Sequence, residues 1–404
     1  MTETVVIAGA GHAAGQVVAS LRQKKFPGRI VLLGEESWLP YQRPPLSKKF
    51  LAGELAAERL YFKPASFYDA ADIEVHLNTR VATIDCDQRT VTTGNGETFA
   101  YSRLVLALGA RPRKLALPGA ELAGIHYLRS IDDVLAIQSE FQSGRRLVIV
   151  GAGYIGLEVA AVAAQLGLDV TVVEMEKRVM SRVVSPQLSE FYQQEHVAQG
   201  VTLKLASGTS GFSGNENLQN VLLDSGEQLP ADLAIVGVGI VPNVELAENA
   251  GLEIENGVVV DDHCQTSDQN IFAVGDCTFH PNDLLGRRLR LESVHNALEQ
   301  AKTAAGNICG ENVSYAQVPW FWSDQYDLKL QIVGLSQGYD EIVMRGDPQT
   351  RSFACLYLRD GRLIAVDAVN SPKDFMQSKS LIAGHARIDP GMLANTAIAL
   401  KDMA

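Results

Sequence analysis

Short apolar runs rich in β-branched residues alternate along the chain with stretches of helical spacing. Residues Thr4–Ala8 form such a run, too short for a helix, and predict a buried parallel strand. A glycine-rich turn follows, then apolar residues at helical spacing, and then a second apolar run at Arg29–Leu33. The pattern predicts a βαβ unit within the first 35 residues.

The same pattern returns 142 residues later, with a strand predicted at Arg146–Val150 and another at 170–173. The first turn, residues 9–14, reads G-x-G-x-x-A, and the second, residues 151–156, reads G-x-G-x-x-G. The first glycine permits a tight turn, the second lets backbone N–H groups approach a pyrophosphate, and the small third residue packs helix against strand. An acid follows each third position, Glu35 after 21 residues and Glu174 after 18, where a carboxylate can bind a ribose hydroxyl. Two dinucleotide sites in one chain are typical of an enzyme that passes electrons between two nucleotides.

The remaining pattern completes an α/β fold with two Rossmann-like dinucleotide-binding domains and a C-terminal α+β domain with an antiparallel sheet. We expect a discontinuous first dinucleotide-binding domain at 1–110 and 241–314, a second at 111–240, and a C-terminal domain at 315–404. The predicted strands are 81–84, 90–93, 104–108, 201–205, 218–223, 231–238, 271–274, 329–333, 341–345, 351–358 and 362–369, and the predicted helices are 130–141, 185–199 and 291–310.

Composition narrows the class of protein. The 404 residues are 46% hydrophobic and 20% charged, as in soluble globular proteins, and no apolar run approaches the length that spans a bilayer. The net charge of -12 argues against a nucleic-acid partner. Five scattered cysteines without a C-x-x-C pair argue against a disulfide framework, a metal site and a redox-active dithiol. With no basic, cleavable N-terminal stretch, we expect a cytoplasmic protein that binds neither membrane nor metal.

A proline-rich segment at 38–48 has two interpretations. It is either a solvent-facing connection or a rigid strap that places Lys48 beside a cofactor ring. Further along, Asp276 at a strand end is suited to bind a polyol hydroxyl, although alone it is more often a cap or turn residue. His295 lacks a matching nucleophile or acid, so we expect it to be a structural or surface residue.

Several of these segments resemble the FAD-dependent, NADH-using ferredoxin reductases of bacterial oxygenase systems, over essentially the whole chain. The resemblance rests on the two glycine turns and on the segments Arg43-Pro44-Pro45-Leu46-Ser47-Lys48, Ala273-Val274-Gly275-Asp276, Glu292-Ser293-Val294 and Trp320-Phe321-Trp322-Ser323-Asp324-Gln325-Tyr326. The proline strap and the Trp-Ser-Asp-Gln segment are the more specific motifs. Ala14 in place of the third glycine, and Leu108 where the family often has Thr, are small departures.

The resemblance implies a glutathione-reductase-like fold, with FAD bound non-covalently by the domain at 1–110 and 241–314 and NADH bound by the domain at 111–240. Lys48, Glu158 and Tyr154 would be catalytic: Lys48, paired with Glu158, would stabilise charge on the flavin, Glu158 would orient the carboxamide, and Tyr154 would cover the flavin until nicotinamide displaces it. Glu174 favours NADH over NADPH, whereas Lys177, Arg178 and Arg182 weaken that preference. The cofactor-binding residues that the resemblance implies are Gly9, Gly11, Ala13, Ala14, Glu35, Arg43, Lys48, Val81, Ala107, Arg129, Asp276, Val294, Trp322, Gly151, Gly153, Tyr154, Ile155, Gly156, Glu158, Glu174, Arg182 and Gly239.

The implied activity is transfer of electrons from NADH through FAD to a two-iron ferredoxin that serves an oxygenase, such as a cytochrome monooxygenase. Two alternatives stay open: a reductase of the same fold that uses rubredoxin, oxygen or a quinone, and a flavoprotein whose main role is redox-dependent partner binding. We expect a monomer or weak homodimer. An acidic ferredoxin would need a local basic patch, for which the candidates are Arg287, Arg288, Arg290, Lys329 and Arg345.

Overall fold

The computed structural model describes residues 3–403, which form two compact units. Unit 1 contains the chain up to Arg43 together with Ala57–Arg111 and Ile240–Gln317. Unit 2 contains Pro44–Ala56, Pro112–Gly239 and the chain from Val318 onward. The short segment Pro44–Ala56, which carries Lys48, therefore belongs to unit 2 although it lies early in the sequence.

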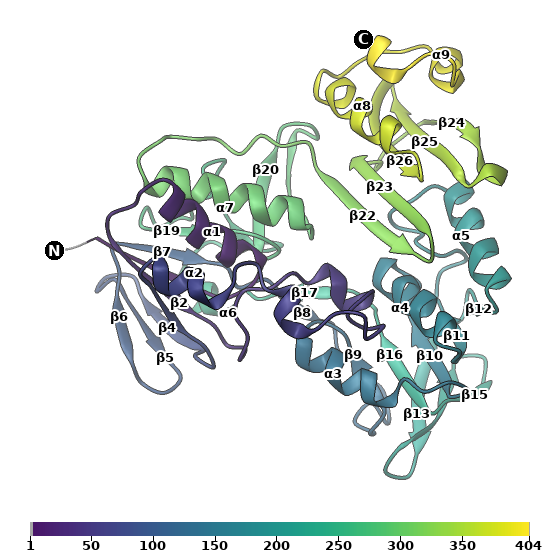
Figure 1. Ribbon diagram of the computed structural model, residues 1–404, viewed down its shortest axis with the longest axis horizontal. Coiled ribbons are helices and arrows are strands. Elements are labelled where there is room, and N and C mark those ends of the chain that lie inside the picture. The colour runs from purple at the N-terminus through teal and green to yellow at the C-terminus, as the bar shows by residue number, and fades with distance from the viewer. Residues whose placement is uncertain (1–2, 404) are drawn as a thin grey trace. The chain divides into compact units, whose positions relative to one another are not determined.

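Unit 1 is built on a five-stranded parallel sheet with the strand order β19-β7-β1-β2-β3 (Figure 1). Helices α1 (His12–Gln23) and α7 (Val294–Ile308) pack against each other over one face of this sheet. The strands are β1 (Thr4–Ala8), β2 (Arg29–Leu33), β3 (Ile73–His76), β7 (Arg103–Leu106) and β19 (Ile271–Ala273).

Both faces of this sheet are buried, which explains the unbroken apolar run of β1. Val5 and Ile7 pack in one core cluster with α1 and α7. Val6 and Ala8 point to the opposite face, where the cluster includes Val91 of a smaller antiparallel sheet. Alternate residues of a strand point to opposite faces, so a strand covered on both sides must be apolar throughout.

The remaining elements of unit 1 surround this sheet. Three small sheets have the strand orders β4-β5-β6, β18-β20-β21 and β17-β8. The elements are β4 (Val81–Asp85), β5 (Thr90–Thr93), β6 (Thr98–Ala100), β8 (Ala110–Pro112, whose last residue belongs to unit 2), β17 (Ile240–Pro242), β18 (Val258–Val259), β20 (Thr278–Asn282), β21 (Arg287–Leu289), α2 (Ala65–Ala70), α6 (Glu245–Asn249) and the 3₁₀ helix η2 (Ala57–Leu60).

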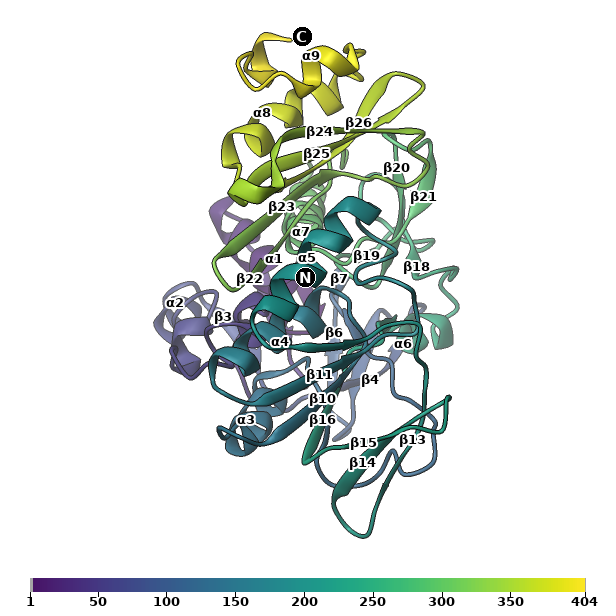
Figure 2. The same cartoon turned by 90° about the vertical axis from the view of Figure 1, so that its right-hand side faces the viewer.

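Unit 2 repeats the parallel arrangement in the order β12-β11-β10-β16-β9 (Figure 1). Three of these strands, β11, β10 and β16, are labelled in Figure 2. A three-stranded antiparallel sheet, β13-β14-β15, contributes Phe212 and Val221 to the core that Val148 and Val150 of β10 share. The elements are β9 (Ile125–Tyr127), β10 (Arg146–Val150), β11 (Asp169–Val173), β12 (Thr202–Lys204), β13 (Thr209–Gly214), β14 (Leu218–Leu223), β15 (Gln228–Pro230), β16 (Leu233–Val236), α3 (Ile131–Glu140), α4 (Tyr154–Gln165), α5 (Pro186–Ala198) and the 3₁₀ helix η1 (Pro44–Ser47).

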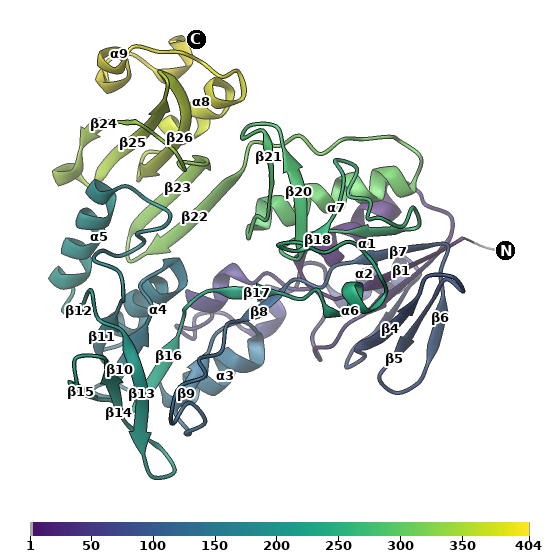
Figure 3. The same cartoon turned by 180° about the vertical axis from the view of Figure 1, so that it is seen from behind.

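The C-terminal part of unit 2 is a five-stranded antiparallel sheet with the order β22-β23-β26-β25-β24 (Figure 3), which confirms the predicted sheet. The sheet begins earlier than predicted, because the Trp-rich segment is itself an edge strand. The elements are β22 (Trp320–Gln325), β23 (Leu328–Gly334), β24 (Glu341–Asp347), β25 (Ser352–Arg359), β26 (Arg362–Val369), α8 (Pro372–Ala383), α9 (Pro390–Ala394) and the 3₁₀ helices η3 (Pro348–Thr350) and η4 (Leu400–Asp402).

Local capping signals set several helix boundaries where the sequence predicts them. Ser130 caps α3 in a reciprocal capping box with Asp133, and Ser293 caps α7 through the N–H of Asn296. The predicted strand at 104–108 is wrong at its end, since β7 stops at Leu106 and Gly109 has a φ of +62°. Within residues 3–403, no helix is long and apolar enough to cross a membrane.

Candidate active site

The turn after β1 forms an open cradle at the start of α1. Gly9 has a φ of +109°, and a Cβ atom there would lie 2.3 Å from the carbonyl oxygen of Ala107. Gly11 is the N-cap of α1, has no capping side chain, and has nothing within 4 Å of its Cβ position. The uncapped N–H groups and the open space fit a pyrophosphate, which supports a dinucleotide at this turn.

Several other residues expected at the first site also lie in unit 1. The Cβ position of Gly275, which directly precedes Asp276, lies 3.4 Å from Cβ of Ala13 on α1. Val294 opens α7, Val81 opens β4, and Ala14 is fully buried in the core beneath the turn. The fold therefore brings the glycine turn and the segment that carries Asp276 together at one edge.

Two charged residues expected at the first site already have protein partners. Arg43 makes an ion pair of 2.6 Å with Glu36 and donates to the hydroxyl of Tyr41 at 3.0 Å. Glu35 follows β2, its side chain is 68% exposed, and it lies 3.7 Å from Arg80. Arg43 thus helps to shape the loop after β2, while the carboxylate of Glu35 remains accessible to a ribose.

The second turn, after β10, is tighter than the first. Gly151 has a φ of +105°, and a Cβ atom on Gly156 would lie 2.1 Å from the carbonyl oxygen of Gly151. Gly153, the N-cap of α4, has no capping side chain and nothing within 4 Å of its Cβ position. This turn also fits a pyrophosphate, and only glycine fits at its third position.

Glu174 directly follows β11 and lies at the second glycine turn. Its carboxylate accepts the N–H of Ala152 at 2.7 Å and the N–H of Glu176 at 2.9 Å, which holds it against the glycine turn. The guanidinium of Arg178 donates to the carbonyl oxygens of Val184 and Ser181 and to the hydroxyl of Ser189, and so has a structural role.

The other residues expected at the second site differ in accessibility. Lys177 and Arg182 are exposed, and Ile155 is 45% exposed beside the turn. Gly239, beyond β16, has a φ of +101°. Of the three cations expected near this site, Arg178 is bonded to the protein, whereas Lys177 and Arg182 are exposed and could face a bound nucleotide.

A buried ion pair joins the proline-rich segment to α4. The ammonium of Lys48 lies 2.6 Å from the carboxylate of Glu158, whose side chain is only 2% exposed. The Ser47 hydroxyl donates to the same carboxylate oxygen at 2.5 Å, and the Ser323 hydroxyl donates to the other oxygen at 2.7 Å. Residues Pro44–Ser47 of this segment form a 3₁₀ helix with Leu46 and Ser47 buried, so this part is packed against the protein and is not a solvent-facing connection.

Tyr154 and Arg129 lie in unit 2 with this pair. Tyr154 is the first residue of α4 and is half-buried, and burial, together with Asp367, Tyr192 and Glu158, raises its pKa well above the usual value. The tyrosine is therefore a neutral aromatic side chain at any working pH. The N–H of Arg129 donates to the carboxylate of Asp133 at 3.0 Å, which ties this residue to the start of α3.

None of the five cysteines forms a disulfide. Burial raises the pKa of each thiol, to about 11 for Cys277 and to about 12 for Cys355. A thiol with a raised pKa is a poor nucleophile, so no cysteine pair is suited to carry electrons.

One exposed acidic group has the spacing of metal ligands. Asp261, Asp262 and His263 place ligand atoms within 4.8 Å of one another. These side chains already bond locally, Asp261 to the N–H groups of His263 and Gln265, and Asp262 to the ring of His263. Local turn formation accounts for the group.

The expected basic docking patch needs one correction. Arg345 is 4% exposed, pairs with Asp374 at 2.9 Å and donates to three carbonyl oxygens near the C-terminus, so it cannot meet a partner. Arg290 forms an ion pair with Glu292, while Arg287 in unit 1 and Lys329 in unit 2 are exposed. Burial was the deciding factor, and no local signal in the sequence reveals it.

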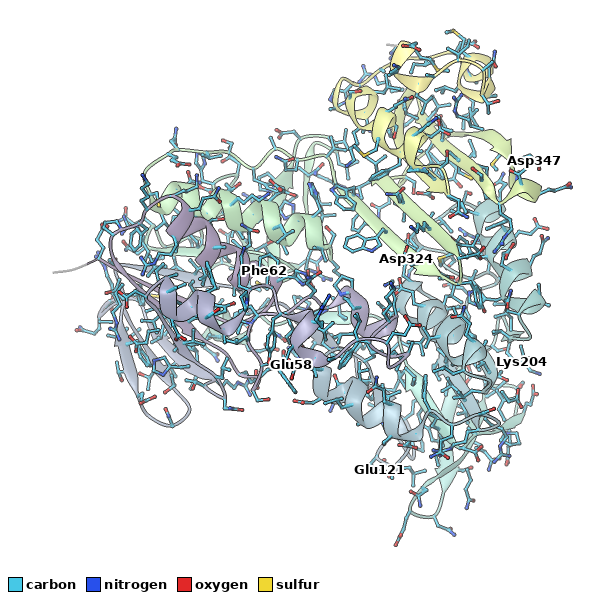
Figure 4. The ribbon with its side chains drawn as sticks, viewed as in Figure 1. Glu58, Phe62, Glu121, Lys204, Asp324 and Asp347 are labelled. Carbon is cyan, nitrogen blue, oxygen red and sulfur yellow. The ribbon has the colours of Figure 1, made fainter. Side chains whose placement is uncertain are left out.

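The Trp-rich strand β22 presents its side chains on two faces. Trp320 and Trp322 lie with ring centroids 5.4 Å apart, and the ammonium of Lys379 lies 4.8 Å from the centre of the Trp320 ring. Asp324, labelled in Figure 4, follows them on this strand. The alternating residues Ser323 and Gln325 are fully buried. The motif was recognised in the sequence, but the contact of Ser323 with Glu158 was missed.

Two open glycine cradles, each at the start of an uncapped helix, are typical of a protein that binds two dinucleotides. The sequence matches the pyridine nucleotide-disulphide oxidoreductase family over residues 3–301 and a reductase C-terminal domain over residues 320–404. The chain belongs to this family, whose members use a flavin and a nicotinamide cofactor.

Full-length relatives narrow the comparison. A ferredoxin–NAD(P)+ reductase of Sphingomonas sp. is 44% identical, with 97% of this chain and 96% of that protein covered. Putidaredoxin reductase of Pseudomonas putida is 41% identical, with 99% and 96% covered. The solved structure of a covalent putidaredoxin reductase–putidaredoxin complex contains a chain that matches with a TM-score of 0.96 and 41% identity, covering 99% of this chain and 97% of that one.

Proposed function

We propose that this protein is an NADH-dependent ferredoxin reductase, which passes electrons through bound FAD to a two-iron ferredoxin that serves an oxygenase such as a cytochrome monooxygenase. The observation that carries the proposal is the pair of glycine turns, each open above an uncapped helix. Relatives that align over nearly the whole chain and carry ferredoxin reductase names support the choice of acceptor. The five free cysteines favour a reducing compartment, so we assign the enzyme to the cytoplasm.

We assign FAD to the cradle of unit 1 and NADH to the cradle of unit 2. In unit 1, Asp276 lies next to Gly275 at the sheet edge and is suited to accept a ribityl hydroxyl, and Glu35 is accessible to the adenosine ribose. In unit 2, the carboxylate of Glu174 lies at the glycine turn, where it accepts a 2′-hydroxyl and repels a 2′-phosphate. The carboxylate of Glu174 therefore favours binding of NADH, which has a 2′-hydroxyl, over binding of NADPH, which has a 2′-phosphate.

When bound, the flavin supplies the ability to take two electrons from NADH and release them one at a time. The chain supplies charge and position. Lys48 would supply the positive charge that stabilises a bound, electron-rich flavin ring, and its ion pair with Glu158 fixes the direction of the ammonium. Glu158 also offers its carboxylate to the carboxamide of nicotinamide. Tyr154 is neutral and half-buried at the start of α4. It would serve as an aromatic cover for the flavin until nicotinamide binds.

The cysteines argue against a disulfide reductase, and this narrows the class of electron acceptor. A disulfide reductase needs a reactive dithiol, and the five thiols here have raised pKa values and no disulfide partner. Electrons must therefore leave for an external carrier. A small iron–sulfur protein takes one electron at a time and suits this requirement.

The proposal is tested by mixing the purified yellow protein with NADH and a two-iron ferredoxin and following bleaching of the iron–sulfur absorption. We expect rapid, catalytic bleaching that exceeds the rates with rubredoxin, oxygen and quinone. Faster reduction of any of those acceptors would replace the ferredoxin assignment. A persistent charge-transfer complex with NAD+ and no turnover would instead point to a partner-binding flavoprotein.

The role of Lys48 is tested in the same assay with ferricyanide as acceptor. Lys48→Met should lower the rate of flavin reduction by NADH about tenfold or more, because one charged hydrogen bond and a positive charge are lost. Lys302→Met is the matched control, since Lys302 forms an exposed ion pair with Glu299 on the surface of α7. Equal rates for the two variants would remove Lys48 from the mechanism.

A further inference from the structure

A line of buried hydrogen bonds leads from Glu158 into the C-terminal sheet. The hydroxyl of Ser323 lies 2.7 Å from Oε1 of Glu158, and Nε2 of Gln325 lies 3.2 Å from that hydroxyl. Oε1 of Gln325 lies 2.9 Å from Nε2 of His196 on α5, and Nδ1 of His196 lies 2.9 Å from the hydroxyl of Tyr326. Ser323, Gln325 and His196 are fully buried, and all five residues belong to unit 2.

The chemistry of these groups fixes the direction of every bond in the line. A carboxylate only accepts, so the proton of Ser323 goes to Glu158, and the Ser323 oxygen must accept from the amide NH₂ of Gln325. The amide oxygen of Gln325 then accepts from the Nε2–H of His196. Burial lowers the pKa of His196, so the ring is neutral and its Nδ1 accepts from the hydroxyl of Tyr326.

All four donors therefore point toward Glu158. Bonds aligned in one direction polarise one another, and the last of them, from Ser323, is strengthened at the carboxylate. Because the amide NH₂ of Gln325 donates to the Ser323 oxygen, the Ser323 hydroxyl cannot donate to that group and instead donates to Glu158. Oε1 of Glu158 is thus held by Ser323, while Oε2 is held by Lys48 and Ser47.

We infer that Ser323 and Gln325 are positioning residues for Glu158, through which the C-terminal sheet sets the geometry of the nicotinamide site. The inference rests on the proposed role of Glu158 in NADH binding and deepens it. Strand alternation makes the arrangement possible, since Ser323 and Gln325 share one face of β22 while Trp320 and Trp322 share the other. The same strand can thereby carry an aromatic surface and a buried support for the active site.

The test compares Ser323→Ala with Ser323→Thr in the intact holoenzyme. Loss of one hydrogen bond to a charged group should raise the KM for NADH and the dissociation constant for NAD+ about tenfold, with kcat for ferricyanide nearly unchanged. Ser323→Thr retains the hydroxyl and should recover most of the affinity. NAD+ affinity is measured by calorimetry on the oxidised protein, which does not depend on turnover.

Two further variants keep the result interpretable. Ser378→Ala is the matched control, because Ser378 is also fully buried in unit 2 and donates only to the carbonyl oxygen of Phe375. Tyr326→Phe removes the first donor of the line at a half-buried site and should raise both constants about twofold through weaker polarisation. If Ser323→Ala fails to fold, Tyr326→Phe carries the test, and unchanged constants in it overturn the inference.

Glu158→Gln separates this inference from the proposed function. If Glu158→Gln weakens NADH binding while Ser323→Ala behaves like Ser378→Ala, the positioning role is wrong and the assignment of Glu158 stands. If Glu158→Gln also binds NADH normally, both the role of Glu158 in NADH binding and the positioning role of Ser323 and Gln325 are wrong. A rise in KM for Ser323→Ala that Ser323→Thr does not reverse indicates altered packing and also overturns the inference.

Discussion

Replacing Glu174 with Gln tests how the protein chooses between NADH and NADPH. The carboxylate is half-buried at the end of β11 and is held at the glycine turn by the N–H groups of Ala152 and Glu176. Gln keeps the shape and one oxygen acceptor but loses the negative charge. We therefore expect NADH binding to change little and NADPH binding to improve.

The magnitude follows from the charge and its surroundings. Two like charges about 4 Å apart repel by about 1 kcal/mol in water and by about 4 kcal/mol at the effective dielectric near a protein surface. A half-buried carboxylate facing a 2′-phosphate lies between these limits, so Glu174→Gln should raise kcat/KM for NADPH by about fivefold to a thousandfold. Arg178 is bonded to Val184, Ser181 and Ser189 and is not available to offset the repulsion in the parent protein.

The assay is steady-state reduction of ferricyanide with each nucleotide at low and high salt. Glu176→Gln is the control, because it removes the same charge from an exposed side chain two residues away. The gain for NADPH should shrink as salt increases, since mobile ions screen exposed charges. An unchanged ratio of NADPH to NADH efficiency at low salt would refute the reasoning.

Three further predictions follow from individual contacts. Gly153→Ala should fold normally but raise the KM for NADH, because its methyl group enters the open cradle. Gly156→Ala should raise the KM for NADH and also lower the unfolding temperature, because its methyl group would lie 2.1 Å from the carbonyl oxygen of Gly151. Burial raises the pKa of Asp367 to about 7, so the contribution of its protonated form to folding stability is fully present below the ordinary carboxyl pKa and is lost as pH rises through about 7. Thermal melts of Asp367→Asn should depend less on pH over this range, and an unchanged pH slope would contradict this. Arg287→Glu should raise the apparent KM for ferredoxin at low salt and leave ferricyanide reduction unchanged. Arg345→Met should lower the free energy of unfolding, measured with denaturant, by about 3 kcal/mol or more and leave the KM for ferredoxin unchanged.

The sequence alone predicted the two βαβ units and most of the C-terminal strands. These elements depend on local physics, namely apolar runs of strand length, glycine turns and serine caps. Gly9 and Gly151 both adopt positive φ, as a tight turn requires. The pairing of Lys48 with Glu158 was also anticipated, but only from the resemblance, because 110 residues separate the two.

Other features of the site were decided by tertiary structure. Three contacts depend on which distant segments pack together. Arg345 is buried against Asp374, Arg178 bonds to Ser189, and Ser323 bonds to Glu158. The repeated turns also differ in a way that spacing does not reveal: Ala14 fits at the third position of the first turn, while the second turn leaves no room for a Cβ at Gly156.

What the sequence by itself determined was the set of local elements and the chemistry of the two nucleotide turns, because backbone conformation and side-chain period act over a few residues. Only the tertiary structure decided which polar side chains become partners. Burial removes water from Glu158, and a buried carboxylate must then find its donors wherever the fold places them, in this protein on the proline-rich segment and on the Trp-rich strand.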